Sequence, residues 1–350
     1  MSRDVIGVIG AGTMGRGIAQ VFAEAGHRVI FHDQSPEQLT GAVGFIHQMI
    51  DRAVEKGRKE AAEGEAAKAR LEAAAGLDAF APCDIVVEAI VEAVEPKQQL
   101  FAALAGICGP QTVLCTNTSS LSVTAIAAGV PHPERVAGLH FFNPVPLMKL
   151  AEVIPGARTM DGLCDRLTAL VEGIGHRPVR AADSPGFLVN HAGRGLYTEG
   201  LRIVQEGVAT THQVDAVMRE AAGFRMGPFE LLDLTGLDVS YPVMRLIYEQ
   251  FWQEPRFRPS PLPPIRVAAG LLGRKTGEGF YAYEGQKIQR PPEPPVPQIA
   301  ALPPVQVAGE GGSALAEALD VEWISPRTTP RRDALLLVAP MGEDATTTAL

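Results

Sequence analysis

The 350-residue sequence has few cysteines and no long apolar run. Its four cysteines show no C-x-x-C spacing, which argues against a zinc site and against a redox-active cysteine pair. No apolar run reaches the roughly 18 residues that a membrane-spanning helix needs. The first apolar strand begins at Val5, so we expect no signal peptide ahead of it. These features together favour a cytoplasmic protein that holds no metal.

The sequence also lacks an excess of positive charge. It has 31 Lys and Arg residues against 40 Asp and Glu residues, so its net charge is −9 at pH 7. This balance argues against general nucleic-acid binding. Hydrophobic residues make up 46% of the chain and charged residues 20%, as in ordinary globular proteins. We therefore expect a globular protein of about two domains that binds neither nucleic acid nor a membrane.

Residues 5–15 contain an apolar run that leads into a G-x-G-x-x-G pattern formed by Gly10, Gly12 and Gly15. In a dinucleotide-binding fold, the first glycine permits a tight turn and the second lets a diphosphate approach the backbone. The third lets the helix pack closely on the strand. An amphipathic run follows, so the amides at the start of a helix would face the anion. The expected cofactor contacts are Gly10, Ala11, Gly12, Thr13, Met14 and Gly15.

A second apolar strand, residues 28–32, ends at Asp33. The distance from Gly15 to Asp33 is close to the roughly 20 positions expected for the acid that binds the adenosine ribose. Its carboxylate would accept hydrogen bonds from the ribose hydroxyls and would repel a 2′-phosphate. The sequence therefore predicts NAD rather than NADP. The alternative is an ordinary β-α-β unit with a surface aspartate.

The segment from residue 41 to residue 76 is rich in Ala, Glu, Lys and Arg. It is too long for a simple crossover, so we interpret it as an inserted antiparallel helix pair. Lys56 belongs to a cluster of basic residues near Gly57. Such a cluster is either a solvated helix face or a contact to the polyphosphate tail of a substrate.

Four apolar segments further along the chain predict additional strands. They cover residues 84–90, 113–120, 135–144 and 147–154. In open α/β sheets, ligands bind outside the carboxyl ends of the strands. Ser119, His140 and Asn143 are expected at such ends, and therefore near the cofactor.

His140 is a natural candidate for a general base, because the unperturbed pKa of histidine lies near neutrality. Glu152 follows on the next predicted strand, where its carboxylate would fix the ring tautomer and stabilise the imidazolium. The alternatives are a structural histidine and a buried acid that pairs with Lys149. Side-chain alternation along a strand places Lys149 on the opposite face from Glu152, which argues against that pair.

The character of the sequence changes at residues 183–186. Ser184 suits a helix N-cap and Pro185 suits a first helical position, so we expect a long helix over residues 186–205. Further helix starts are expected near Thr210, Gly227 and Asp238. Because no parallel-strand pattern follows, residues 185–283 are predicted to form an all-helical second domain after a first domain of residues 1–184. Residues 284–350 are predicted to be a proline-rich linker and a poorly ordered tail, with one helical fragment and one short apolar run.

Seven ordered motifs resemble a known family. They occupy residues 10–15, 116–121, 138–144, 149–153, 183–190, 227–231 and 275–281. In these motifs the sequence is similar to the L-3-hydroxyacyl-CoA dehydrogenases, over about four fifths of the chain. The resemblance implies a Rossmann-like, doubly wound α/β sheet with an inserted helix pair, followed by an all-helical C-terminal domain. It also implies NAD-linked oxidation of an (S)-3-hydroxyacyl-CoA to the 3-oxoacyl-CoA.

The resemblance also implies roles for individual residues. His140 matches the family's catalytic base, and Glu152 matches the carboxylate that orients it. Ser119 and Asn190 match the groups that hold the substrate oxygen. The positions that contact the nicotinamide cofactor correspond to Asp33, Glu92, Lys97, Ser119, Asn143 and Lys275. The family binds CoA partly through the inserted helix pair, which favours a contact by Lys56, and commonly dimerises through the helical domain, so we expect a homodimer.

Residues 251–260 resemble a loop of the phenylacetate-degradation branch of the family. The substrate of that branch, 3-hydroxyadipyl-CoA, ends in a carboxylate, which Arg256 or Arg258 would meet. The alternative is that both arginines are solvated loop residues. Members of this branch continue through a linker into a second, smaller helical copy, which this sequence lacks, so we expect a truncated chain.

Three other functions are alternatives. A short-chain 3-hydroxybutyryl-CoA dehydrogenase of fatty-acid β-oxidation or butyrate metabolism would use the same site. A cofactor-binding protein without turnover would keep the fold, but the complete set of Ser119, His140, Glu152 and Asn190 argues against it. A β-hydroxyacid dehydrogenase acting on free acids would rely on a lysine in a different motif.

Overall fold

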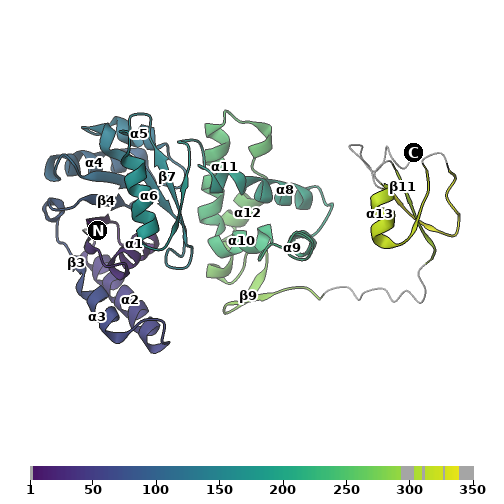
Figure 1. Ribbon diagram of the computed structural model, residues 1–350, viewed down its shortest axis with the longest axis horizontal. Helices are drawn as coiled ribbons and strands as arrows, with labels where there is room; N and C mark the ends of the chain where they lie inside the picture. Colours follow the sequence, from purple (N-terminus) through teal and green to yellow (C-terminus); the bar gives the residue numbers. More distant parts are fainter. Residues whose placement is uncertain (1–2, 293–302, 310–311, 326–327, 339–350) are drawn as a thin grey trace. The chain divides into compact units, whose positions relative to one another are not determined.

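An eight-stranded sheet is the central element of the structure, which is a computed structural model (Figure 1). The structure describes residues 3–292, 303–309, 312–325 and 328–338. The strands of the sheet are β1 Val5–Ile9, β2 Arg28–His32, β3 Leu71–Ala73, β4 Ile85–Glu88, β5 Val113–Thr116, β6 Val136–Phe141, β7 Leu150–Pro155 and β8 Arg177–Arg180. They lie in the order β3-β2-β1-β4-β5-β6-β7-β8. Neighbouring strands are parallel except β6 and β7, which are antiparallel.

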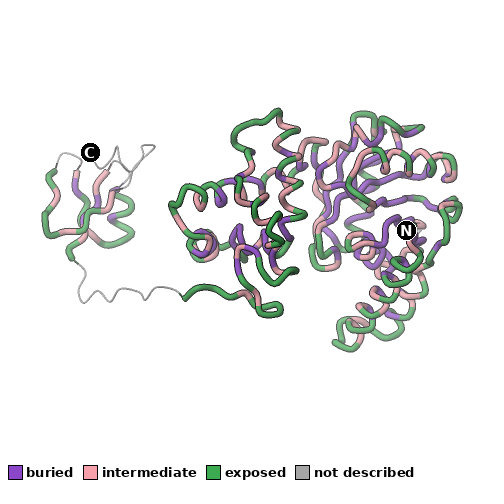
Figure 2. The backbone as a smooth tube through the Cα atoms, turned by 180° about the vertical axis from the view of Figure 1, so that it is seen from behind, coloured by how far each residue is buried: buried purple, intermediate pink, exposed green. Residues whose placement is uncertain are grey.

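Helices cover both faces of this sheet. They are α1 Thr13–Glu24, α4 Val94–Ile107, α5 Val123–Ala128 and α6 Leu163–Gly173. Val8 of β1 belongs to a hydrophobic core that also contains residues of α1 and α6, whereas Ile9 belongs to a second core with residues of α4 and α5. The central strands are buried along nearly their whole length (Figure 2), as expected for a parallel sheet between two helix layers. The predicted doubly wound α/β fold is confirmed.

A helix pair is inserted between β2 and β3. It consists of α2 Pro36–Glu55 and α3 Ala61–Ala69, and Figure 1 shows it projecting beyond the sheet. The first helix of the pair begins at Pro36, ahead of the residues 41–76 assigned to the insertion, at a Ser-Pro-Glu sequence that favours a helix start. The hydroxyl of Ser35 accepts a hydrogen bond from the amide of Gln38, and Pro36 takes the first helical position.

The residues from 189 to 290 are mostly helical. They form α7 Val189–Ala192, α8 Arg194–Gln205, α9 Thr211–Glu220, α10 Pro228–Thr235, α11 Leu237–Gln250 and α12 Leu262–Ala268, followed by a hairpin of β9 Ala282–Glu284 and β10 Lys287–Gln289. Buried side chains such as Leu201, Phe229 and Met244 form the core of this part. The carboxylate of Asp215 holds the start of α10, because it accepts hydrogen bonds from the amides of Phe229 and Glu230.

The predicted long helix over residues 186–205 is wrong at its start. The first helical residue is Val189, because Gly186 (φ 75°) and Phe187 (φ 49°) adopt the left-handed conformation, which a helix cannot contain. Gly193 then separates α7 from α8. Ser184 is therefore not the helix cap. The turn places the amides of residues 188 and 189 against the sheet, at the site described below.

Within residues 291–350, the described residues form a second compact unit, which is described by itself. Its elements are β11 Val305–Ala308, α13 Gly312–Leu319, β12 Glu322–Trp323 and β13 Leu335–Val338. The three strands form a parallel sheet in the order β12-β11-β13, with Val307 and Ala316 buried. This part has more regular structure than the sequence leads us to expect, and most of the proline-rich segment lies outside the described residues.

The cysteines are placed in the interior of the fold. All four cysteines are free and buried, and burial raises the pKa of the Cys83 thiol to about 12. Within the described ranges, no group of three or more His, Cys, Asp or Glu side chains is arranged to hold a metal ion. No helix in this part of the chain is long and apolar enough to cross a membrane.

Candidate active site

A histidine and a glutamate form the centre of the site. His140 on β6 and Glu152 on β7 are paired across the two antiparallel strands, so their side chains lie on the same face of the sheet. The Nδ1 atom of His140 lies 2.7 Å from Oε2 of Glu152, and both residues are buried. Lys149, the partner that the alternative interpretation gives to Glu152, is exposed. The carboxylate therefore acts on the histidine ring.

The second oxygen of Glu152 is held by the backbone. Oε1 accepts hydrogen bonds from the amides of Leu188 (2.9 Å) and Val189 (2.8 Å), at the left-handed turn before α7. Burial alone would raise the pKa of Glu152, but the hydrogen bonds from His140 and from these two amides outweigh it and lower the pKa. The carboxylate is therefore ionised near neutral pH. Its bond to Nδ1 leaves Nε2 as the ring nitrogen that can take up a proton.

His140 lines a cavity of about 330 Å³ between the eight-stranded sheet and the helices of residues 189–290. The cavity is also lined by Met14, Glu92, Ser119, Asn143 and Asn190. The side-chain amide of Asn190 donates to the carbonyl oxygen of Ser119 at 3.1 Å, which joins the start of the helical part to the turn after β5. The structure thus brings together most of the residues to which the resemblance assigns chemistry.

Glu92 organises the turn that carries Ser119. Its Oε1 atom accepts hydrogen bonds from the hydroxyl of Thr118 (2.6 Å) and from the amides of Ser119 (2.9 Å) and Ser120 (3.2 Å). Its other oxygen lies 3.3 Å from Nζ of Lys97. Partial burial would raise the pKa of Glu92, but the positive charge of Lys97 and these hydrogen bonds lower it. The negative charge of Glu92 therefore fixes the shape of the turn.

Lys97 does not line the cavity. Its ammonium is buried and lies 2.6 Å from Oε1 of Glu88, a fully buried carboxylate at the end of β4. The other oxygen of Glu88 accepts a hydrogen bond from the hydroxyl of Thr116 at 2.8 Å. Lys97 therefore holds Glu92 from the side that faces away from the cavity. The sequence analysis missed Glu88, although an acidic residue inside an apolar strand is a signal that could have found it.

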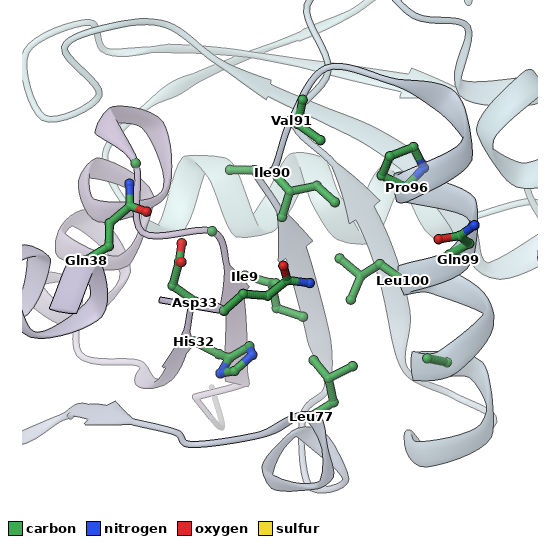
Figure 3. Close-up of a pocket in the computed structure, with 15 residues that line it drawn as sticks. Ile9, His32, Asp33, Gln38, Leu77, Ile90, Val91, Pro96, Gln99 and Leu100 are labelled. Atoms are coloured by element: carbon green, nitrogen blue, oxygen red, sulfur yellow. The ribbon is translucent and has the colours of Figure 1, made fainter. Parts of the chain in front are cut away.

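A second cavity, of about 560 Å³, lies along the glycine loop (Figure 3). In the figure, Asp33 lies beside the loop, and the apolar side chains of Ile90 and Leu100 border the other side. The carboxylate of Asp33 accepts hydrogen bonds from the amides of Ala11 (2.6 Å) and Ser35 (2.9 Å). This cavity shares Ala89 and Ile90 with the cavity at His140, so the two are neighbours.

The glycine loop fits a dinucleotide. Gly10 has φ 102°, and a Cβ atom there would overlap the carbonyl oxygen of Ala89. A Cβ atom at Gly15 would overlap the carbonyl oxygen of Gly10, which keeps the helix close to the strand. A Cβ atom at Gly12 would meet no protein atom within 4 Å, so this position faces open space where a diphosphate can approach. No side chain caps α1, so the amides at its start are free to bind the diphosphate. None of the described residues that line the cavity is Lys or Arg, so the cavity offers no cation to the 2′-phosphate of NADP and suits NAD.

Besides Lys97, four basic residues predicted as contacts lie outside both cavities. Lys275 is exposed, and its ammonium lies 2.6 Å from a carboxylate oxygen of Asp238 near the start of α11. Lys56 is exposed at the end of α2, in the projecting helix pair. Arg256 is exposed and pairs with Glu254 at 3.3 Å. Arg258 lines a separate hollow of about 390 Å³ on another face of α11, so the structure does not bring either arginine to His140.

One charged residue of the cavity at His140 was not singled out in the sequence. Arg194, the first residue of α8, lines this cavity and is 2% exposed. It lies four positions after Asn190, a spacing that places the two on one side of the helical path and could have signalled it. Residues of α7, α10 and α11 line the same cavity, an arrangement that residue spacing does not reveal.

Comparisons with known proteins agree with this arrangement. Residues 5–184 match the family model described as the NAD binding domain of 3-hydroxyacyl-CoA dehydrogenase. Residues 186–283 match the model of the C-terminal domain of the same enzyme. The two matched segments meet between the sheet and the helices, where the cavity lies.

Individual relatives and a solved structure extend the similarity. The chain is 46% identical over 282 residues to the 3-hydroxyadipyl-CoA dehydrogenase of Escherichia coli K12, a match that covers 81% of this chain and 59% of that protein. It is 42% identical over 277 residues to a probable 3-hydroxybutyryl-CoA dehydrogenase of Deinococcus radiodurans, covering 79% and 99%. The crystal structure of an (S)-3-hydroxybutyryl-CoA dehydrogenase from Ralstonia eutropha superposes with a TM-score of 0.78 at 37% identity, covering 81% of this chain and all of that one.

Proposed function

The chain belongs to the 3-hydroxyacyl-CoA dehydrogenase family, and from this membership we propose that it oxidises (S)-3-hydroxyadipyl-CoA to the 3-oxoacyl-CoA with NAD. The observation that carries the proposal is the buried pair of His140 and Glu152, which lines a cavity next to the dinucleotide crevice. A base at this position can take the proton of an alcohol whose carbon lies near the cofactor. The reaction class follows from the family. The identity of the acyl chain is proposed beyond it.

In the proposed mechanism, Nε2 of His140 takes the proton of the 3-hydroxyl group. Glu152 stabilises the imidazolium that forms, because its carboxylate lies against Nδ1. Ser119 and Asn190 donate hydrogen bonds to the oxygen as it becomes a carbonyl. Asn190 keeps one N–H free after donating to the Ser119 carbonyl, and the Ser119 hydroxyl exchanges its long 3.4 Å contact with Oε1 of Glu92 for the substrate oxygen. When bound, NAD supplies the acceptor for the hydride that leaves C3. Orienting the two reactants can lower the barrier by roughly 7–11 kcal/mol.

The cofactor is held by the glycine loop, residues 10–15, and by Asp33. Asn143 and Glu92 line the cavity at His140, where they would contact the nicotinamide end of the cofactor, and Lys97 pairs with Glu92. For the CoA moiety we assign the inserted helix pair with Lys56, whose exposed ammonium suits a phosphate. Lys275 acts on the cofactor site indirectly. It pairs with Asp238 near the start of α11, and other residues of α11 line the cavity.

The proposed assembly is a homodimer through the helical domain, and the proposed location is the cytoplasm. Several large apolar side chains of this domain are exposed, among them Val208 (74%), Val217 (61%) and Phe224 (48%). These side chains belong to or follow the neighbouring helices α8 and α9, and a contiguous apolar surface of this kind is typical of a face that a partner covers. Size-exclusion chromatography with light scattering distinguishes a dimer from a monomer.

The acyl chain is tested by NADH formation with 3-hydroxyadipyl-CoA and 3-hydroxybutyryl-CoA at equal, sub-saturating concentrations. A higher kcat/KM for the adipyl substrate supports the proposed substrate. A higher value for the butyryl substrate favours the alternative, a short-chain enzyme of fatty-acid or butyrate metabolism, and leaves the roles of His140 and Glu152 in place. No NADH with either substrate contradicts the proposed function.

A further inference from the structure

Arg194 is a buried cation without a counter-ion. Its Nε and Nη1 atoms are inaccessible to solvent and have no hydrogen-bond partner among the described residues. No carboxylate of the described chain lies within 4 Å of its guanidinium. Arg135, which is equally buried, donates to the carbonyl oxygens of Gly109 (2.7 Å) and Ala105 (3.0 Å). Burying a cation without such partners costs free energy, and a bound anion would offset this cost. Arg194 is therefore a candidate anion-binding residue.

The position of Arg194 links this missing anion to the substrate. Asn190, Arg194 and Tyr197 follow one side of the helical path from α7 into α8, and all three line the cavity that holds His140. The ring of Tyr197 lies 5.4 Å from the guanidinium carbon, which provides a cation–π contact but accepts none of its N–H groups. Arg194 is the only Lys or Arg among the described residues that line this cavity.

The acids near the cavity are already engaged. Both oxygens of Glu152 are occupied, by His140 and by the backbone amides of the turn before α7. Glu92 is held by the turn around Ser119 and by Lys97. The opposite wall, formed by α10 and α11, contributes neutral residues such as Thr235 and Val243. The described residues that line this cavity therefore offer no anion to Arg194.

We propose that Arg194 binds the distal carboxylate of a dicarboxylic 3-hydroxyacyl-CoA and so determines the specificity for the end of the acyl chain. This inference rests on the proposed function. In a 3-hydroxyadipyl chain, three carbon–carbon bonds separate the reacting carbon from the terminal carboxyl carbon. A substrate whose hydroxyl lies at His140 therefore carries its carboxylate into the same small cavity.

A guanidinium suits this ligand because its planar N–H groups can bind both carboxylate oxygens. A chain that ends in a methyl group would leave the N–H groups of Arg194 unpaired, which penalises the wrong substrate. Burial lowers the pKa of Arg194 from its ordinary value, as expected for a cation in a site that lacks its anion. Arg256 and Arg258, the arginines suggested by the sequence, are exposed and lie outside this cavity.

The test compares two ligands of equal carbon number that cannot turn over, adipyl-CoA and hexanoyl-CoA. Their Kd values are measured by calorimetry on the full chain in the presence of NADH. We expect the wild type to bind adipyl-CoA about 10–100-fold more tightly than hexanoyl-CoA, a ratio that corresponds to the free energy of a hydrogen bond to a charged group. Equal affinities, or tighter binding of hexanoyl-CoA, overturn the proposal without any substitution.

Variants then assign the preference to the residue. In Arg194→Gln the ratio of the two Kd values should fall to about 1–3, whereas the matched control Arg256→Gln should keep the wild-type ratio. Arg194→Lys retains a cation but loses the paired N–H groups, so it should keep a reduced preference. If Arg194→Gln does not fold, the lysine variant decides, and an unchanged ratio in either Arg194 variant overturns the proposal.

A separate measurement distinguishes this inference from the proposed function. If the wild type forms no NADH from any 3-hydroxyacyl-CoA, the function itself is wrong. If it forms NADH but shows no preference for adipyl-CoA over hexanoyl-CoA, only the role of Arg194 is wrong. An equal loss of affinity for both ligands in Arg194→Gln would indicate a structural role and would also overturn the proposal.

Discussion

His140 and Glu152 face each other across the one antiparallel strand pair of the eight-stranded sheet, with Nδ1 2.7 Å from Oε2. The pairing register sets this distance, because directly opposed residues of antiparallel strands have neighbouring Cβ atoms. The amides of residues 188 and 189 then hold the glutamate from the helical side. The base is therefore oriented jointly by the sheet and by the first turn of the helical domain.

The lowered pKa of Glu152 predicts how stability depends on pH. A carboxyl group whose pKa is lower in the folded state stabilises the fold above its unfolded pKa, near 4.3. This contribution is lost as the pH falls through the lowered, folded-state pKa. We expect the stabilisation of the wild type relative to Glu152→Gln to be present above about pH 5 and to shrink as the pH falls below that value.

Urea unfolding at a series of pH values measures this difference. The exposed Glu172→Gln variant is the matched control for removal of one carboxylate elsewhere on the domain. A gap between wild type and Glu152→Gln that widens as the pH falls would contradict the assignment of a stabilising, ionised Glu152.

Two glycines of the loop should respond oppositely to the same substitution. Gly12→Ala places its Cβ in open space, so stability should fall by about 1 kcal/mol at most, the cost of a less suitable helix cap. The methyl group enters the space of the diphosphate, and NAD affinity should fall about 10-fold or more. Gly15→Ala forces its Cβ against the carbonyl oxygen of Gly10, so it should destabilise the fold by about 1–3 kcal/mol.

Thermal unfolding and NAD titration of both variants provide the comparison. Gly12→Ala should separate the two readouts, with weak binding and a near-normal melting temperature. Normal NAD affinity in that variant would show that the cofactor does not approach the loop at Gly12.

The buried pair of Lys97 and Glu88 should matter for stability more than any exposed pair. Lys97→Met leaves the fully buried Glu88 without its counter-ion, so we expect a loss of about 3–5 kcal/mol in unfolding free energy. The control, Arg245→Met, breaks the exposed pair of Arg245 and Glu249 and should cost at most about 0.5 kcal/mol. Equal losses in the two variants, measured by denaturant unfolding, would contradict the structural role of the buried pair.

The sequence predicts the β1–α1 unit and β2 well, because the spacing of Gly10, Gly12 and Gly15 permits few other conformations. It also places His140 and Glu152 on neighbouring strands. It cannot reveal that β6 and β7 are antiparallel, since strand direction depends on the path of the connection rather than on local residues. The cross-strand register that joins the two side chains emerges only in the folded sheet.

Other features depend on tertiary packing. The apolar residues around Phe187 look helical, but the chain turns there to bring its amides to Glu152. Arg194 looks like an ordinary surface residue of an amphipathic helix, but in the fold it is buried and lines a cavity with residues of α10 and α11. Arg256 is the opposite case, because the motif of residues 251–260 suggests a binding role, whereas its side chain remains exposed in the fold.

The most direct test of the proposed site is the turnover of His140→Gln with a 3-hydroxyacyl-CoA and saturating NAD. General base catalysis accelerates a reaction by about 10²–10⁴-fold, so kcat should decrease by a factor in that range. The Kd of NAD should change by less than about 2-fold, because His140 does not line the cavity at the glycine loop. A variant that keeps wild-type turnover would contradict the account, because it would show that another group takes the proton.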